Sequence, residues 1–303
     1  MQDTPLALAP IAVVERETGI GKDTLRVWER RYGFPQPLRD DNGERLYPAD
    51  QVARLRLMRR LMAAGHRPSQ LVGATEAQLQ TMITALPEAK PSETVPGELI
   101  EIIRLLKEHD TGRLRSAFVQ RLSRQGLEHF VTCCVPLLNQ MVGEAWSRGE
   151  LEVFEEHLYT EQLQALLRQA IAALPSEGST PRILLTTVPE EQHVLGLLML
   201  EALLRLDGAG CVSLGAQTPL TDIVAGALAH QVDIVVLSFS AAFPARQVPV
   251  LTTRLREALP ADIELWVGGA GTQRLPNITG VLTADRLHAA QDYLAAWRSR
   301  QHN

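Results

Sequence analysis

Three short groups of residues in the C-terminal third of the chain combine side chains suited to holding a metal-centred cofactor. The first contains His193, with Glu191 two residues before it and Gly196 three residues after it. A neutral imidazole is a common metal ligand, and a nearby carboxylate can accept the other ring N–H and fix the tautomer. The group therefore predicts His193 as a metal ligand, although a histidine found alone at a strand end is more often a surface or helix-cap residue.

The second and third groups supply hydroxyls and glycines. Forty-one residues separate Gly196 from Ser238, which ends an apolar run with Phe239 and Ser240, and 27 more separate Ser240 from Gly268 and Gly269. Serine hydroxyls can donate to or accept from a polar ligand, and glycines permit close approach of the backbone. Together with the first group, these residues are the candidate cofactor site.

Alternating strands and helices are expected to position all three groups. Strands are predicted at 182–188, 211–214, 233–238, 264–267 and 280–283, and helices at 194–206, 220–230, 245–259 and 284–300. The strands are too apolar for burial on one face, which favours a doubly wound, flavodoxin-like parallel sheet covered on both sides. Ligands of such sheets bind beyond the carboxyl ends of the strands, where the three groups lie.

Helices are predicted in the middle of the chain as well. Residues 98–174 have helical spacing of apolar side chains, with breaks near Asp110, Gly126 and Gly149. Four helices joined by short turns favour a four-helix bundle. Proline-rich segments at 87–97 and 174–181 are interpreted as linkers, so the expected domains are 1–80, 98–174 and 181–303.

The N-terminal segment predicts a winged helix-turn-helix, which makes the whole chain a multidomain α and α/β protein. Helices are expected at 11–18, 22–32 and 48–64, and a hairpin wing at 35–47. The second helix opens after a glycine turn and carries arginines at helical spacing that can reach phosphates or guanine edges. The candidate DNA-binding residues are Lys22, Thr24, Arg26, Arg30, Arg31, Tyr32, Arg39, Arg45 and Tyr47. The alternative is a solvated amphipathic helix with a stripe of arginines.

Charge is distributed unevenly along the chain. The net charge of the 303 residues is −5, yet residues 1–75 carry 12 Lys and Arg against 9 Asp and Glu. A basic N-terminal segment on an acidic body is typical of a DNA-binding module joined to a different module. The sequence shows no apolar run of membrane-spanning length, no secretory signal pattern and no disulfide framework, so a cytoplasmic protein is expected.

Two segments resemble known families. The run from Ile20 to Gly33, followed by Gly43 to Tyr47, resembles the recognition helix and wing of MerR-family regulators. A small module of this kind needs a second copy for specificity, so a homo-oligomer on double-stranded promoter DNA is expected. The three C-terminal groups resemble the cobalamin-binding pattern Asp-x-His-x-x-Gly, Ser-x-Leu, Gly-Gly, with Glu191 in place of Asp and Ser240 in place of Leu.

A third motif narrows the resemblance. Trp146 is followed after nine residues by Glu156 and His157, which resembles the helical cap of the CarH/LitR class of cobalamin-dependent photoreceptor regulators. The resemblance implies adenosylcobalamin with His193 below the cobalt, and the other three residues around the adenosyl group. It also implies a light-responsive repressor that changes between dimer and tetramer. The histidine that follows the Trp in light-sensing members is Ser147 here, which is a poor cobalt ligand.

Three other interpretations remain open. The C-terminal module could bind another tetrapyrrole such as haem, or a protein antagonist, without responding to light. A corrinoid enzyme is not expected, because 303 residues leave no room for a substrate barrel beside the N-terminal module. A metal-sensing MerR regulator would use cysteines, but Cys133 and Cys134 lie in an apolar stretch and are expected to be buried. The absorption spectrum of the purified protein separates the first of these from a corrinoid.

Overall fold

The computed structural model describes residues 8–18, 20–63, 66–84, 97–174, 180–284 and 286–301. The chain forms two compact units, Met1–Asp110 with Leu138–Leu158, and Thr111–Leu137 with Tyr159–Asn303. Most of the two predicted linkers lies outside the described residues. Among the helices that are described, each is too short or too polar to cross a membrane.

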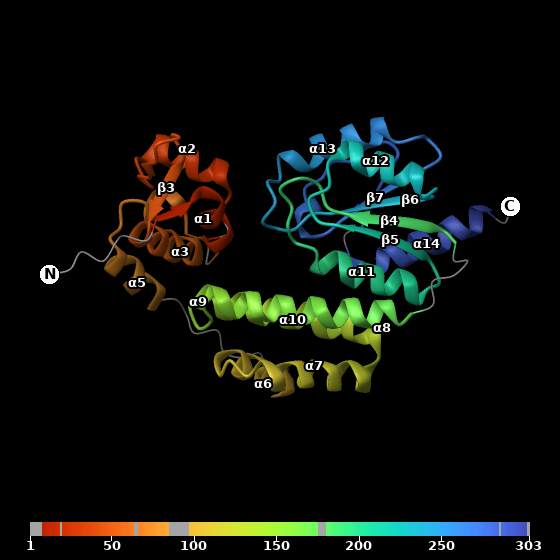
Figure 1. Ribbon diagram of the computed structural model, residues 1–303, viewed down its shortest axis with the longest axis horizontal. Helices are drawn as coiled ribbons and strands as arrows, with labels where there is room; N and C mark the ends of the chain where they lie inside the picture. The colour runs from red at the N-terminus through yellow and green to blue at the C-terminus, as the bar shows by residue number, and fades with distance from the viewer. Residues whose placement is uncertain are drawn as a thin grey trace. The chain divides into compact units, whose positions relative to one another are not determined.

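The N-terminal domain consists of short helices around a three-stranded antiparallel sheet (Figure 1). Its elements are β1 (Leu8–Pro10), α1 (Ile11–Thr18), α2 (Lys22–Tyr32), β2 (Leu38–Arg39), β3 (Arg45–Pro48), α3 (Ala49–Ala63), α4 (Pro68–Leu71) and α5 (Glu76–Thr84). The sheet order is β1-β3-β2, so the predicted wing hairpin, β2 and β3, also pairs with a strand that precedes α1. The winged helix-turn-helix prediction is confirmed.

Local contacts fix both ends of α2. The backbone N–H of Lys22 donates to Glu15 Oε1 of α1 at 3.0 Å, which satisfies a donor that the first turn of a helix leaves unpaired. At the other end Gly33 adopts φ 67°, and its N–H donates to the carbonyl of Glu29. Glycine is favoured there because a residue with a Cβ is strained in the left-handed conformation. Leu25 and Trp28 pack the inner face into the domain core.

The middle segment forms four consecutive helical rods. They are α6 (Gly97–Lys107), α7 (Thr111–Gln125), the run of α8 (Leu127–His129), η1 (Phe130–Cys134) and α9 (Val135–Arg148), and α10 (Val153–Ala172). The breaks fall at Asp110, Gly126 and Gly149, as predicted. One turn, η1, is a π-helix that the sequence did not indicate. The rods are shared between the two units, so a separate bundle domain at 98–174 stays a prediction.

The C-terminal segment is a five-stranded parallel sheet in the order β5-β4-β6-β7-β8. Its elements are β4 (Arg182–Thr186), α11 (Leu195–Leu206), β5 (Gly210–Gly215), α12 (Leu220–Ala229), β6 (Ile234–Ser238), α13 (Gln247–Ala258), β7 (Glu264–Gly268), η2 (Ala270–Thr272), β8 (Val281–Ala284) and α14 (Leu287–Gln301). The doubly wound prediction is confirmed. The first and third strands of the segment, β4 and β6, are direct neighbours.

Helices cover both faces of this sheet, with α12 and α13 on one side and α11 and α14 on the other (Figure 1). Alternate residues of each strand enter opposite cores. Leu184 and Val235 belong to the cluster that contains α12 and α13 side chains. Ile183 and Val236 belong to the cluster that contains α11 and α14 side chains. Burial on both faces explains why the strands have continuous apolar sequences.

Candidate functional site

The first two C-terminal groups meet at the carboxyl edge of the sheet. Strand β4 leads into the loop that carries Glu191 and His193, and β6 ends at Ser238. The two strands pair in parallel, with Thr186 opposite Leu237, so their ends lie side by side. This is the point where the chain order of the strands reverses, and it is where α/β sheets bind ligands.

Glu191 connects the two loops. Its Oε1 accepts from Nδ1 of His193 at 2.6 Å and from the His193 backbone N–H at 2.9 Å. Its Oε2 accepts from the backbone N–H of Ser240 at 2.7 Å. The carboxylate is almost completely buried, whereas the His193 side chain is 61% exposed. The imidazole is therefore held at Nδ1, and the side chain is more than half exposed.

Hydrogen bonding keeps the Glu191 carboxylate ionised. Burial opposes its charge, but the hydrogen bonds from His193 and Ser240 outweigh burial and hold the pKa of Glu191 below its ordinary value. An ionised carboxylate only accepts hydrogen bonds, so Nδ1 of His193 carries the proton in this contact, and in the neutral form of the ring the lone pair is on Nε2. An exposed ring with this tautomer fits an axial cobalt ligand.

Ser240 lies beside the imidazole. Its hydroxyl is 3.1 Å from Nδ1 of His193, on the same nitrogen that Glu191 binds. The sequence predicted this residue only as part of the cofactor site, so the contact with the ring is an addition from the structure. A hydrogen bond across 47 residues depends on the paths of two loops, and no local sequence signal reveals it.

The glycines have two different roles. At Gly196 a Cβ would lie 3.7 Å from the hydroxyl of Ser238, so these two predicted residues are neighbours, and a side chain at 196 would make only an ordinary contact with Ser238. At Gly268 a Cβ would lie 3.2 Å from the Ala284 carbonyl, and at Gly269, which has φ 96°, it would lie 2.3 Å from the Phe239 carbonyl. Beyond the predicted approach of a cofactor, Gly268 and Gly269 are needed for contacts within the domain.

The cap residues of the predicted site lie on α9 and α10 in the first unit. Trp146 is half-buried, and Nε2 of His157 lies 3.8 Å from Oε2 of Glu156. Ser147 donates its hydroxyl to the carbonyl of Glu144 in its own helix at 2.7 Å. Because His193 and Ser238 belong to the second unit, a single site that contains both groups stays a prediction.

A hydrogen bond between His109 and the buried Glu155 carboxylate, which no sequence pattern singled out, fixes the start of α10. Oε1 of Glu155 lies 2.9 Å from Nε2 of His109, and its Oε2 accepts from the backbone N–H of Glu152 at 2.6 Å. The pair precedes Glu156 and His157 directly, so it positions the turn that carries them. The acidic residue three positions after Glu152 is a capping pattern that could have revealed this contact.

The adjacent cysteines differ in exposure. Cys134 is buried in η1, with its sulfur 3.4 Å from Nε of Arg121 and 2.6 Å from Oε1 of Gln125. Cys133 is exposed, which corrects the expectation that both are buried. Within the described part of the chain, no cluster of three or more His, Cys, Asp or Glu side chains is arranged to hold a metal ion.

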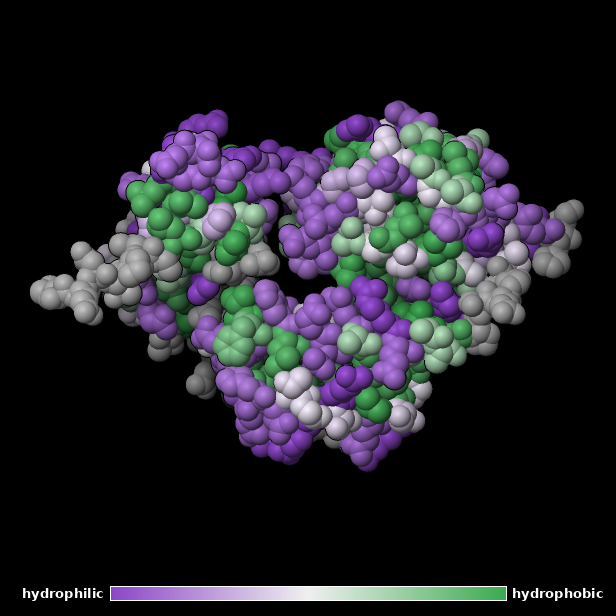
Figure 2. Space-filling view, viewed as in Figure 1, coloured by the Kyte–Doolittle hydropathy of each residue, from purple (hydrophilic) through white to green (hydrophobic). Residues whose placement is uncertain are grey.

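Most of the candidate DNA-binding residues lie on the surface. Figure 2 shows mainly hydrophilic residues over α2 on the face in view. The exposed residues are Thr24, Arg26, Arg30, Arg31 and Arg39, while Lys22, Tyr32 and Arg45 are half-buried. Arg26 pairs with Asp23 at 3.1 Å, and Nε of Arg45 pairs with Oε2 of Glu29 at 2.8 Å. The wing is therefore connected to α2 by an ion pair.

Tyr47 does not lie on the surface. It has no exposed area, belongs to the core of the N-terminal domain, and its hydroxyl has no hydrogen-bond partner within the described residues. The prediction that Tyr47 contacts DNA is therefore corrected: the second half of β3, Tyr47 and Pro48, is buried against the core of the N-terminal domain. Its burial raises the pKa of the phenol above the ordinary value.

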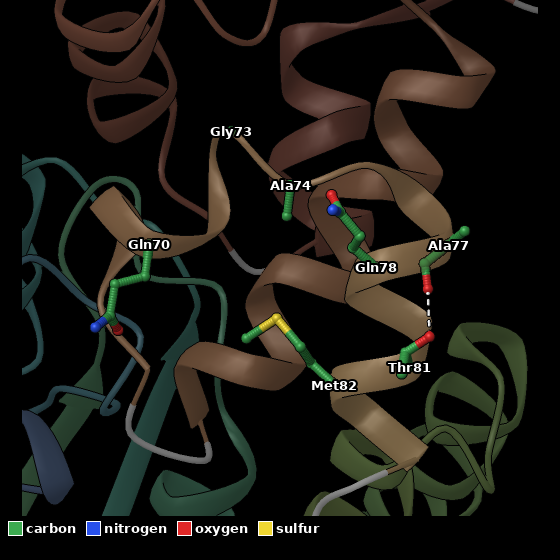
Figure 3. A pocket seen from close by; sticks show the side chains of 7 residues that line it. All are labelled: Gln70, Gly73, Ala74, Ala77, Gln78, Thr81 and Met82. Carbon is green, nitrogen blue, oxygen red and sulfur yellow. Dashed lines mark hydrogen bonds between the residues drawn. The ribbon is translucent and has the colours of Figure 1, made fainter.

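An open pocket lies between α4 and α5 (Figure 3). The side chain of Thr81 donates to the carbonyl of Ala77 on its wall at 2.9 Å. None of the candidate DNA-binding or cofactor-binding residues is among those that line it: Gln70, Gly73, Ala74, Ala77, Gln78, Thr81 and Met82.

Comparisons with known proteins agree with this division. Residues 10–78 match the family described as MerR HTH family regulatory protein, and residues 181–280 match the B12 binding domain. A Methanosarcina barkeri monomethylamine corrinoid protein superimposes with a TM-score of 0.52 at 16% identity, over 65% of this chain and 96% of that chain. At this identity the likeness shows the fold alone.

Two curated relatives match most of the chain. One is the HTH-type transcriptional repressor CarH of Myxococcus xanthus, 32% identical over 271 residues, which are 87% of this chain and 89% of that protein. The other is the HTH-type transcriptional repressor CarA of the same organism, 30% identical over 291 residues, 95% of each chain. The chain therefore belongs to the family of transcriptional regulators that join a MerR helix-turn-helix to a B12 binding domain, the family of these two repressors.

Proposed function

We propose that this protein is a cobalamin-dependent, light-responsive transcriptional repressor whose DNA binding and oligomeric state are set by adenosylcobalamin. The observation that carries the proposal is the exposed His193 ring, held at Nδ1 by the buried Glu191 carboxylate at the carboxyl edge of the sheet. A DNA-binding domain in the same chain gives such a site a regulatory rather than an enzymatic use.

In this proposal the residues divide between the two faces of the corrin. His193 would hold the cobalt from below, with Ser238 and Gly196 beside the cofactor's tail. Trp146, Glu156 and His157 would line the space for the upper group. When bound, adenosylcobalamin supplies a cobalt–carbon bond that light can break, a property of the cofactor itself. The repressor function then requires only that the cofactor bind one assembly better than another.

The cofactor half of the proposal is tested by one titration. His193→Ala removes the ligand, and His230→Ala is the control, because His230 is an exposed histidine of the same domain at the end of α12. We expect the wild type and His230→Ala to retain adenosylcobalamin through gel filtration and His193→Ala to lose it. Equal retention by all three would contradict axial ligation by His193.

The light response is tested on the loaded full-length protein. Absorption spectrum, mass in solution and binding to its promoter DNA are measured in the dark and after green light. We expect all three to change together. A protein that keeps its mass and its DNA affinity after photolysis would be a cobalamin-binding regulator that does not respond to light.

The DNA-binding half is tested through the salt dependence of affinity. If Arg26 contacts a phosphate, Arg26→Ala lowers the slope of log K against log salt by about one per contact. The control is Arg274→Ala, an exposed arginine of the second unit. An unchanged slope for Arg26→Ala would remove this residue from the interface.

A second candidate function follows from Ser147. Its hydroxyl bonds its own helix, and serine is a poor cobalt ligand. The alternative is a MerR-type regulator whose C-terminal module binds haem or a protein antagonist and does not respond to light. A Soret band in the purified protein, or failure to retain either tetrapyrrole, would favour it.

A further inference from the structure

The exposed face of α2 carries an apolar side chain among charged ones. Val27 is 49% exposed, whereas Leu25 and Trp28 of the same helix are buried. Successive residues turn about 100° around an α-helix, so Val27 lies about 200° from Leu25 and faces away from the domain core. Its burial therefore requires a partner outside this domain.

The surroundings of Val27 define the chemistry of that partner. Arg26, Arg30 and Arg31 are exposed on the same helix, and Arg26 is paired with Asp23 at 3.1 Å. One small apolar group among three arginines and the Asp23 carboxylate does not match an apolar protein surface. It matches the major groove of DNA, where phosphates flank the grooves and the 5-methyl of thymine is the isolated apolar group on the base edges.

We propose that Val27 contacts the 5-methyl group of a thymine in each half-site of the operator. The inference rests on the proposed DNA-binding function and adds a base preference to it. In a helix-turn-helix the second helix lies in the major groove, and an aliphatic side chain there distinguishes thymine from cytosine and from uracil by the methyl alone. The arginines beside it contact phosphates or guanine, and the valine supplies the thymine contact.

The experiment removes one methyl group at a time from each partner. An operator is first selected from random DNA with the loaded full-length protein in the dark. Each thymine is then replaced singly by deoxyuridine, and affinities are measured for the wild type and Val27→Ala. Val250→Ala is the matched control, because Val250 is a 56% exposed valine on α13. Val27 is exposed, so its truncation does not disturb the core.

The expected result is a coupling between one thymine and one side chain. At one position in each half-site, uracil weakens wild-type and Val250→Ala binding by about four-fold, the equivalent of about 0.8 kcal/mol for one methyl-sized group. Val27→Ala binds the thymine and uracil operators equally at that position. When uracil replaces the thymine in both half-sites, the loss of wild-type affinity is the product of the two single losses.

Three other outcomes would overturn the proposal, and only one of them would also contradict the proposed DNA-binding function. If uracil weakens wild type and Val27→Ala equally, another residue contacts the methyl. If uracil has no effect anywhere, no thymine methyl is read. In both cases sequence-specific binding survives, and only the role of Val27 is lost. If the folded, loaded protein selects no DNA sequence, the proposed DNA-binding function fails together with it.

Discussion

At the scale of single residues, Glu191 connects the two loops at the edge of the sheet. Its two oxygens bind the imidazole of His193 on one side and the backbone of Ser240 on the other. The family pattern has Asp at this position, and the longer Glu side chain makes both of these contacts. Ser240, where that pattern has Leu, adds a hydroxyl to the same ring nitrogen.

The hydroxyl of Ser240 is expected to contribute to cobalamin affinity. Loss of a group that orients a metal-bound histidine commonly costs 10- to 100-fold in affinity. Because Glu191 still holds the ring in Ser240→Ala, we expect a loss at the lower end, roughly ten-fold, and a wild-type value for Ser240→Thr. The measurement is an absorption titration with hydroxocobalamin.

Ser213→Ala, which removes an exposed hydroxyl from the edge strand β5, is the control for Ser240→Ala. The prediction is contradicted if Ser240→Ala titrates as the wild type does, or if Ser240→Thr is as weak as the alanine variant. Either result would mean that the hydroxyl near Nδ1 has no part in positioning the ring.

At the scale of elements, Gly269 in the turn after β7 is expected to be the glycine that tolerates substitution least. Gly269→Ala combines a strained φ with a Cβ 2.3 Å from the Phe239 carbonyl. Gly215 has φ 78° with nothing within 4 Å of a Cβ, so Gly215→Ala measures the strain alone. We expect about 1–2 kcal/mol of destabilisation for Gly215→Ala and clearly more for Gly269→Ala. If urea unfolding gives equal losses of unfolding free energy for the two variants, the turn after β7 accommodates the added Cβ without cost.

A buried acid in α11 gives the C-terminal domain a pH-dependent stability. Burial raises the pKa of Glu201 above its ordinary value, although Arg205 lies 3.4 Å away. The protonated form is therefore favoured in the folded state, and its contribution is present in full below the ordinary pKa. As the pH rises through the raised pKa, the carboxyl ionises in the core and that contribution is lost.

Glu201→Gln removes this titration and keeps the size of the side chain. The free energy of unfolding of Glu201→Gln should therefore fall less than that of the wild type between about pH 4.5 and neutrality. The control is Glu257→Gln, an exposed acid of α13. If the two variants and the wild type follow parallel pH profiles, Glu201 titrates alike in the folded and unfolded chains.

The sequence predicted most elements because their signals are local. The periodic apolar residues and Gly33 define α2, and continuous apolar runs define β4 and β6. It missed β1, three residues without alternation whose partner β3 lies far along the chain. It also missed the burial of Tyr47 and the contact of Ser240 with His193, since both depend on how distant segments pack.

At the scale of the whole molecule, the replacement of the expected histidine by Ser147 has a testable consequence. Ser147→His supplies the imidazole that the light-sensing members of the resembled class carry next to the Trp. We expect the illuminated Ser147→His protein to show a spectrum with two nitrogen ligands, unlike the illuminated wild type. The change in mass on illumination, followed in the same samples, shows whether this ligand alters assembly.

Ser147→Thr is the matched control, because it keeps a hydroxyl that can bond the carbonyl of Glu144. Identical photoproduct spectra for the wild type, Ser147→Thr and Ser147→His would contradict the placement of this residue above the cobalt. That result would leave ligation by His193 untouched, since the two residues are tested by separate variants.

The strand order has a consequence for where related chains can accept insertions during evolution. Strands β4 and β6 are neighbours, yet the chain between them also forms the edge strand β5. The 27 residues from Asp207 to Asp233 therefore run out to β5 and back to the amino-terminal end of β6. Their turn at His230 and Gln231 lies at the amino-terminal edge. Residues inserted there would lengthen this connection without moving Glu191 or Ser240. Related chains are therefore free to differ in length at that turn while His193 keeps its surroundings.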